Sequence, residues 1–71
     1  MVSYKKLWKL LIDKDLKKRD LMEIAKLNPA TVSKLNRGEN MNTDVLVRIC
    51  TALNCNVADI MDIYPDNNQN E

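Results

Sequence analysis

The stretch NPATVSKLNRG, residues 28–38, has the residue types that contact nucleic acid. It contains two cations, Lys34 and Arg37, several hydrogen-bonding side chains and no acid. Only Val32 and Leu35 are sizeable apolar residues, although the flanking segments are rich in Leu, Ile and Met. Cations and small polar groups can approach phosphates and base edges, whereas acids are repelled by phosphates. The composition therefore indicates a surface that faces a polyanion.

Other kinds of site chemistry have little support in the sequence. The chain contains no histidine, and Cys50 and Cys55 do not form a CxxC motif, so we expect no metal site. Its single glycine excludes a Gly-rich phosphate loop, and Asp13 and Asp15 fall on different faces of a helix. We therefore expect no enzyme activity and no cofactor. We interpret both cysteines as small core residues rather than redox sensors.

The charged residues divide unevenly along the chain, although the net charge is only +1. Residues 1–38 hold ten Lys or Arg and four acids, a balance of +6, whereas residues 39–71 hold one Arg and six acids, a balance of −5. This asymmetry indicates one side that faces a polyanion and another that is turned away from it. Basic residues that merely coat exposed helix faces are the alternative.

The length of 71 residues predicts one small domain over residues 1–65, followed by a polar tail, residues 66–71, that we expect to be disordered. A chain of this size buries roughly 60% of its unfolded surface, so its stability is modest. Without a disulfide framework or a metal, oligomerisation is the remaining aid to stability. The sequence has no signal peptide and no apolar run near about 18 residues, which favours a soluble cytoplasmic protein without membrane contact.

Apolar residues recur at helical spacing and predict an all-α domain of five short helices. These helices are expected over residues 4–14, 18–26, 29–37, 43–53 and 57–64. Ser3, Asn28 and Thr43 are the predicted N-caps, and Pro29 suits the first position of the third helix. Gly38 is expected to end that helix in a left-handed conformation.

The second and third predicted helices form a helix-turn-helix, because both are short and their connection is tight. In such a unit the second helix lies in the major groove, so only one narrow stripe of it can face the core. Val32 and Leu35 provide that stripe, and the rest of residues 29–37 is small, polar or cationic. This arrangement explains why the stretch buries so little of itself.

The segment LKKRDLMEIAKLNPATVSKLNRG, residues 16–38, resembles the helix-turn-helix of the lambda-repressor-like, Xre-type (Cro/repressor) family and aligns with it without a gap. The downstream segment TDVLVRICTALNCNVADIM resembles the family's fourth and fifth helices, and the resemblance covers about residues 4–64. It implies a compact five-helix DNA-binding domain. It also implies a sequence-specific transcriptional regulator, a repressor of bacterial or phage type, that binds double-stranded DNA as a homodimer.

Three residues depart from the pattern of that family. Lys18 replaces a Gln that holds a phosphate, and its longer cation keeps this role with looser geometry. Lys26 replaces the glycine of the turn, which implies a non-glycine residue near the left-handed region or a reshaped turn. Asn36 replaces a Glu, which weakens any ion pair made at that position.

The resemblance also implies which side chains contact DNA. The base contacts fall on Pro29, Ala30, Ser33 and Lys34. The phosphate contacts fall on Lys18, Asn28, Thr31 and Arg37. Lys34 is the best specific reader, because a lysine can donate to guanine O6 and N7. Simpler roles are the alternatives: Lys34 as a solvated lysine, Thr31 as a capping residue and Arg37 as a partner of the helix dipole.

The C-terminal segment has more apolar residues than one inner helix face requires. Ile63 lies off the apolar stripe of the helix predicted there, which consists of Val57, Ile60, Met61 and Tyr64. We therefore expect an isologous dimer contact through Ile60, Ile63 and Tyr64. A single exposed isoleucine is the alternative.

A second function class also stays open, because one monomer offers few side chains that can read bases directly. This class is a protein-interaction or antitoxin-like module that keeps the fold but has little DNA specificity.

Overall fold

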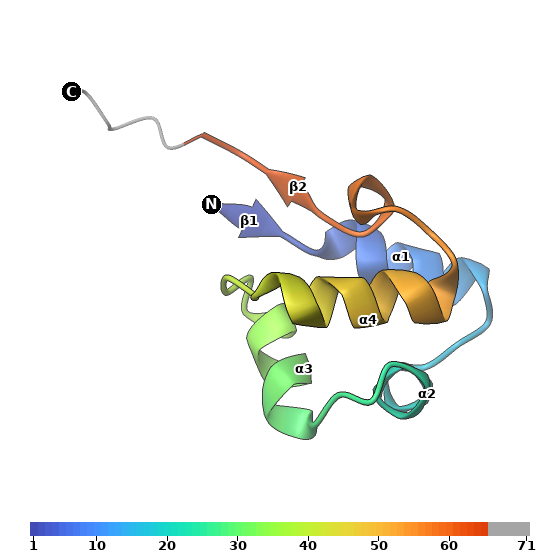
Figure 1. Cartoon of the computed structure of the whole chain (residues 1–71). Helices are drawn as coiled ribbons and strands as arrows, with labels where there is room; N and C mark the ends of the chain where they lie inside the picture. The colour runs from blue at the N-terminus through green and yellow to red at the C-terminus, as the bar shows by residue number, and fades with distance from the viewer. Residues whose placement is uncertain (66–71) are drawn as a thin grey trace.

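Four α-helices, one 3-10 helix and a two-stranded sheet make up the computed structural model, which describes residues 1–65 (Figure 1). The α-helices are α1 (Lys5–Asp13), α2 (Lys18–Ile24), α3 (Pro29–Asn36) and α4 (Thr43–Leu53). The 3-10 helix is η1 (Val57–Asp59), and the strands are β1 (Val2–Ser3) and β2 (Asp62–Ile63). The predicted mostly helical class and the helix-turn-helix of α2 and α3 are confirmed. The predicted tail, residues 66–71, lies outside the described residues.

The core lies between α4 and the other helices. In Figure 1, α4 crosses the middle of the molecule, with α1 along one side and α2 and α3 along the other. The most completely buried side chains come from each α-helix and from the segment after η1: Leu7, Leu21, Leu35, Ile49 and Ile60. Some apolar residues that have helical spacing are nevertheless exposed: Ile12 at the end of α1 is 75% exposed, and Ile24 and Val57 are 46% and 41% exposed. None of the helices in residues 1–65 has the length and apolar character needed to cross a membrane.

All four α-helices are followed by one residue in the left-handed conformation, at φ between 53° and 71°. These residues are Asp15, Lys26, Gly38 and Asn54. In each case the following residue donates its N–H to the carbonyl five positions earlier, at 2.8–3.0 Å: Leu16 to Leu11, Leu27 to Met22, Glu39 to Lys34 and Cys55 to Cys50. This bond is the 6→1 bond of a Schellman motif. The prediction for Gly38 is confirmed, and the α2–α3 turn keeps a left-handed residue although that residue is a lysine.

The fifth helix predicted over residues 57–64 is wrong. Only η1 forms there, and β2 then pairs antiparallel with β1, with Val2 opposite Ile63 and Ser3 opposite Asp62. The spacing of the apolar residues suits a helix, but the partner that determines the conformation lies at the other end of the chain. Pairing with β1 gives the backbone of β2 hydrogen bonds that a helix would otherwise provide.

Two of the three predicted N-caps also need correction. Ser3 lies in β1, and Tyr4 precedes α1 without a capping side chain. Asn42 rather than Thr43 caps α4, since its side-chain oxygen accepts a hydrogen bond from the Val45 N–H at 3.1 Å. The third prediction, Asn28 at the start of α3, is confirmed.

Candidate nucleic-acid interface

Helix α3 presents one side to the core and the opposite side to solvent. Val32 and Leu35 are buried at 8% and 1% exposure and hold the helix against the core. The four residues predicted to contact bases, Pro29, Ala30, Ser33 and Lys34, are all exposed. Their spacing places them on one continuous helix face, since residues three and four apart are neighbours on a helix surface. The helix therefore has an accessible face without acids.

Lys34 and Ser33 are available to a ligand on this face. No side-chain hydrogen bond or ion pair joins either of them to another of the residues 1–65. Lys34 lies in the last turn of α3, where a cation also interacts favourably with the helix dipole. An ammonium and a hydroxyl without internal partners can be directed to base edges at little cost.

Asn28 and Thr31, two of the predicted phosphate contacts, are engaged with each other. The Asn28 side-chain oxygen accepts from the Thr31 N–H at 2.9 Å and from the Thr31 hydroxyl at 3.1 Å. Asn28 is thus the N-cap of α3, and Thr31 completes that cap. The Thr31 hydroxyl therefore bonds to the side chain that caps α3.

Lys18, the third predicted phosphate contact, is held between two other side chains. Its ammonium donates to the Asn36 side-chain oxygen at 2.8 Å and lies 4.5 Å from the centroid of the Trp8 ring. These contacts join the first residue of α2 to the last residue of α3 and to α1. Two of the three departures from the family pattern, Lys18 and Asn36, are therefore partners.

Arg37, the fourth predicted phosphate contact, forms an ion pair with Glu39 just beyond the end of α3. Both side chains are exposed, at 59% and 44%. An exposed ion pair contributes little to stability and exchanges readily. Arg37 can therefore leave Glu39 for a phosphate at small cost.

Two contacts from outside the helix-turn-helix fix its turn and its end. The Arg48 guanidinium, which also pairs with Asp44, donates to the Lys26 carbonyl at 3.1 Å and so connects α4 to the α2–α3 turn. The hydroxyl of the buried Tyr4 donates to the Glu39 carbonyl at 2.9 Å and connects the start of α1 to the end of α3. These bonds limit movement of α3 relative to the core.

Arg19 is a candidate that sequence reasoning missed. It is exposed in the first turn of α2 and has no ion pair with another described residue. Because its neighbour Lys18 reaches the end of α3, this turn lies beside the proposed DNA-binding helix. The consecutive cations Lys17, Lys18 and Arg19 were the available signal.

The residues predicted to form a dimer contact do not all lie on the surface. Ile60 is 0% exposed and belongs to the core, so its side chain offers nothing to a partner. Ile63 and Tyr64 are 73% and 50% exposed at the end of β2. Among residues 1–65, no cluster of three or more Cys, Asp or Glu side chains is arranged to hold a metal ion.

A helix-turn-helix with an accessible, acid-free second helix defines a class of DNA-binding domain. Comparison with known families agrees, because the pattern of the Cro/C1-type HTH DNA-binding domain matches residues 6–66. The chain belongs to this family. It also resembles the crystal structure of the transcriptional regulator VanUg, form II, with a TM-score of 0.86 and 48% sequence identity. That match covers 92% of this chain and 87% of the VanUg chain. A search of curated proteins found no match.

Proposed function

We propose that this protein is a sequence-specific transcriptional regulator, a repressor of bacterial or phage type, that reads the major groove of double-stranded DNA with residues 29–37. The accessible, acid-free face of α3 carries the proposal, since it combines small side chains with a free lysine. The similarity to VanUg, a transcriptional regulator, supports a role in transcription. Repression fits a DNA-binding domain, because a protein that occupies a site near a promoter can block transcription without a surface for a second protein.

The proposed roles on α3 follow from the chemistry of the exposed side chains. Lys34 donates to guanine O6 and N7, Ser33 donates or accepts, and Ala30 contacts a thymine methyl group. Pro29 has no N–H to donate, and its part is to begin the helix. One strong reader per helix gives limited discrimination, so two copies of α3 are needed for a specific site.

The backbone contacts are proposed for Lys18, Asn28, Thr31 and Arg37, with Arg19 added from the structure. Lys18 and Arg37 exchange their present partners, Asn36 and Glu39, for phosphates when DNA arrives. The exposed ion pair of Arg37 costs little to break, whereas Lys18 also gives up its contact with the Trp8 ring. These contacts position the protein on the duplex but do not read its sequence.

We propose a cytoplasmic homodimer whose contact includes Ile63 and Tyr64. Two exposed apolar side chains at the end of β2 support this surface, and the opposed half-sites would lie about 34 Å apart. The Ile63→Asp variant should be monomeric in sedimentation experiments, whereas Ile12→Asp, at an equally exposed position on α1, should dimerise normally. Dimers of equal strength in both variants would contradict this surface.

Selection of bound sequences from random duplex DNA tests the function. We expect a palindromic site, and the Lys34→Ala variant should bind it at least about tenfold more weakly with relaxed preference at one base pair. The control Lys9→Ala removes the same charge from an exposed position on α1 and should change binding little. Recovery of no preferred sequence would reject specific DNA binding.

A protein-interaction or antitoxin-like module is the second candidate, and one observation favours it. Each of the four predicted phosphate contacts already has a partner within the protein. The two candidates differ in their response to salt, because phosphate contacts release counterions from DNA and the affinity therefore falls steeply as the salt concentration rises. A duplex affinity that stays weak and insensitive to salt would favour the interaction module.

A further inference from the structure

The end of α4 brings the two cysteines of the chain together. Asn54 adopts φ 53° and ψ 54°, and the Cys55 N–H donates to the Cys50 carbonyl at 3.0 Å. The Asn54 N–H donates to the Thr51 carbonyl at 3.3 Å, which completes the Schellman motif. In this motif the side chain after the left-handed residue packs on the side chain that lies five positions earlier. In this protein, those two side chains are thiols.

The two thiols lie near each other. Both cysteines are free and half-buried. Burial raises the pKa of the Cys55 thiol, and the nearby Cys50 raises it further. A disulfide requires Cα atoms that are about 4.4–6.8 Å apart and side chains that point toward each other. The 6→1 backbone bond brings these two residues together at the end of α4.

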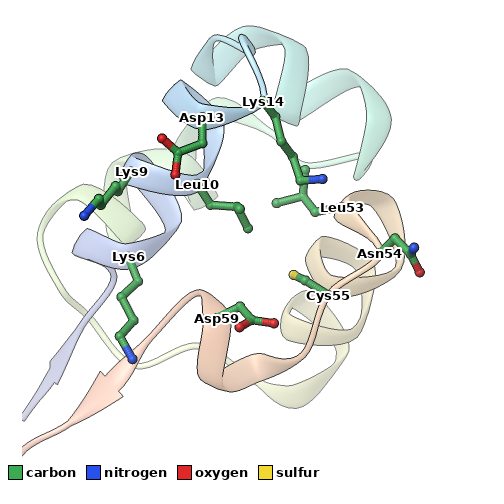
Figure 2. A pocket seen from close by; sticks show the side chains of 9 residues that line it. All are labelled: Lys6, Lys9, Leu10, Asp13, Lys14, Leu53, Asn54, Cys55 and Asp59. Atoms are coloured by element: carbon green, nitrogen blue, oxygen red, sulfur yellow. The ribbon is translucent and has the colours of Figure 1, made fainter.

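The Cys55 thiol is also accessible from outside. It lines a groove of about 340 Å³ between α1 and the segment that leads to η1 (Figure 2). Leu10 of α1 and Lys14, the residue after α1, lie across this groove, and the Cys55 sulfur points into it (Figure 2). A small thiol reagent can therefore reach Cys55 without unfolding the domain.

We propose that Cys50 and Cys55 form a reversible disulfide site that closes within one chain and is oxidised by low-molecular-weight disulfides. One cysteine thiolate attacks a sulfur of glutathione disulfide, forms a mixed disulfide and releases one glutathione thiolate. The other cysteine then attacks the protein sulfur of the mixed disulfide and releases the second glutathione. The two protein thiols lose two electrons and two protons, and one glutathione disulfide becomes two glutathione thiols.

Closure would connect the last turn of α4 to the segment that leads to η1 and β2. This segment carries the exposed Ile63 and Tyr64, so the modification would tether the proposed dimer surface to α4. The disulfide site itself does not depend on the proposed DNA-binding function. Thiolate is the attacking species, so closure should become faster as the pH increases.

Mass spectrometry of the reduced wild-type protein, incubated with glutathione disulfide and quenched in acid, tests the proposal. The wild type should lose the mass of two hydrogen atoms and carry no glutathione. The Cys50→Ser and Cys55→Ser variants should each gain one glutathione, because no second thiol is present. Stable glutathione adducts on the wild type, disulfide-linked dimers on non-reducing gels or thiols that remain free would overturn the proposal.

A second measurement tests whether the folded structure favours the disulfide beyond what the short sequence separation of Cys50 and Cys55 provides. Glutathione redox buffers give the ratio of reduced to oxidised glutathione at which half of the protein carries the disulfide. This ratio should be at least tenfold higher for the native protein than for the protein unfolded in urea. This comparison uses only the wild type, so it holds even if a serine variant is unstable. Equal ratios in the two conditions would show that the turn at Asn54 does not preorganise the thiols, and would overturn the proposal.

Discussion

The ammonium of Lys18 donates to the side-chain oxygen of Asn36 at 2.8 Å, and this bond joins the start of α2 to the end of α3. The Trp8 ring lies beneath the same ammonium, with its centroid 4.5 Å away. A residue that the family resemblance assigned to DNA is therefore also part of the internal structure. The angle between the two helices of the helix-turn-helix depends in part on this contact.

Replacing Lys18 by Met should lower the free energy of unfolding by about 1 kcal/mol, because it removes a hydrogen bond and a cation–π contact. Asn36→Ala should cost less, and the double variant should show a coupling of about 0.5–1 kcal/mol. Urea unfolding of the four proteins measures this cycle. Lys9→Met is the control, because no hydrogen bond or ion pair joins the Lys9 side chain to α2 or α3 among residues 1–65. Strict additivity would mean that the bond does not contribute in solution.

Replacing Glu39 by Gln should strengthen DNA binding, because it releases Arg37 from an ion pair. The slope of log affinity against log salt should change little, because Arg37 contacts a phosphate in both proteins and only the cost of leaving Glu39 is removed. Fluorescence anisotropy with a duplex at several salt concentrations provides this slope. Asp44→Asn is the matched control, since it removes the same charge from the ion pair with Arg48. Identical changes in both variants would point to net charge rather than to Arg37.

Replacing Lys26 by Gly should raise the free energy of unfolding by about 1 kcal/mol, since a non-glycine residue at φ 55° is strained. The carbonyl that accepts from Arg48 belongs to the backbone and is retained. The reverse change at the end of α3, Gly38→Ala, should destabilise by about 1–2 kcal/mol, because φ is 71° and the new Cβ would lie 3.2 Å from the Val2 carbonyl oxygen. Thermal unfolding monitored by circular dichroism checks both signs, and a destabilised Lys26→Gly protein would contradict the strain.

Stability should fall at alkaline pH through Tyr4. Burial raises the pKa of its phenol, and a backbone hydrogen bond at Met41 opposes this in smaller part. Since the folded pKa lies above the ordinary value of about 10, the contribution is complete below that pH and is lost as the pH rises through the folded pKa. Urea unfolding between about pH 8 and 11 should show a steeper loss for the wild type than for Tyr4→Phe. Parallel curves for the two proteins would exclude Tyr4 as the cause.

The local signals in the sequence were sufficient for the four α-helices. Val32 and Leu35 are buried as their spacing predicts, Asn28 caps α3, and Gly38 adopts the left-handed conformation. Each of these features depends on residues within about one or two helical turns. The same local reasoning identified the exposed side of α3, because the residues that do not face the core must face solvent.

The features that sequence reasoning missed depend on contacts between distant residues. Val57, Ile60 and Tyr64 have helical spacing, but β2 forms because Val2 and Ser3 lie opposite it. The contact between Lys18 and Asn36 likewise depends on how α2 crosses α3, which no local pattern specifies. Composition could therefore suggest which cations face DNA, but not which of them already have partners.

Met1 and Tyr64 exchange two backbone hydrogen bonds, from the Met1 amino group at 2.7 Å and from the Tyr64 N–H at 2.8 Å. The two ends of the described chain, residues 1 and 65, therefore lie next to each other. A linker of a few residues between these points would permit a circular permutant that opens at the exposed Asn40. In such a chain α4 would precede α1, and α3 would come last. The fold should therefore form even when its helices follow one another along the chain in this different order.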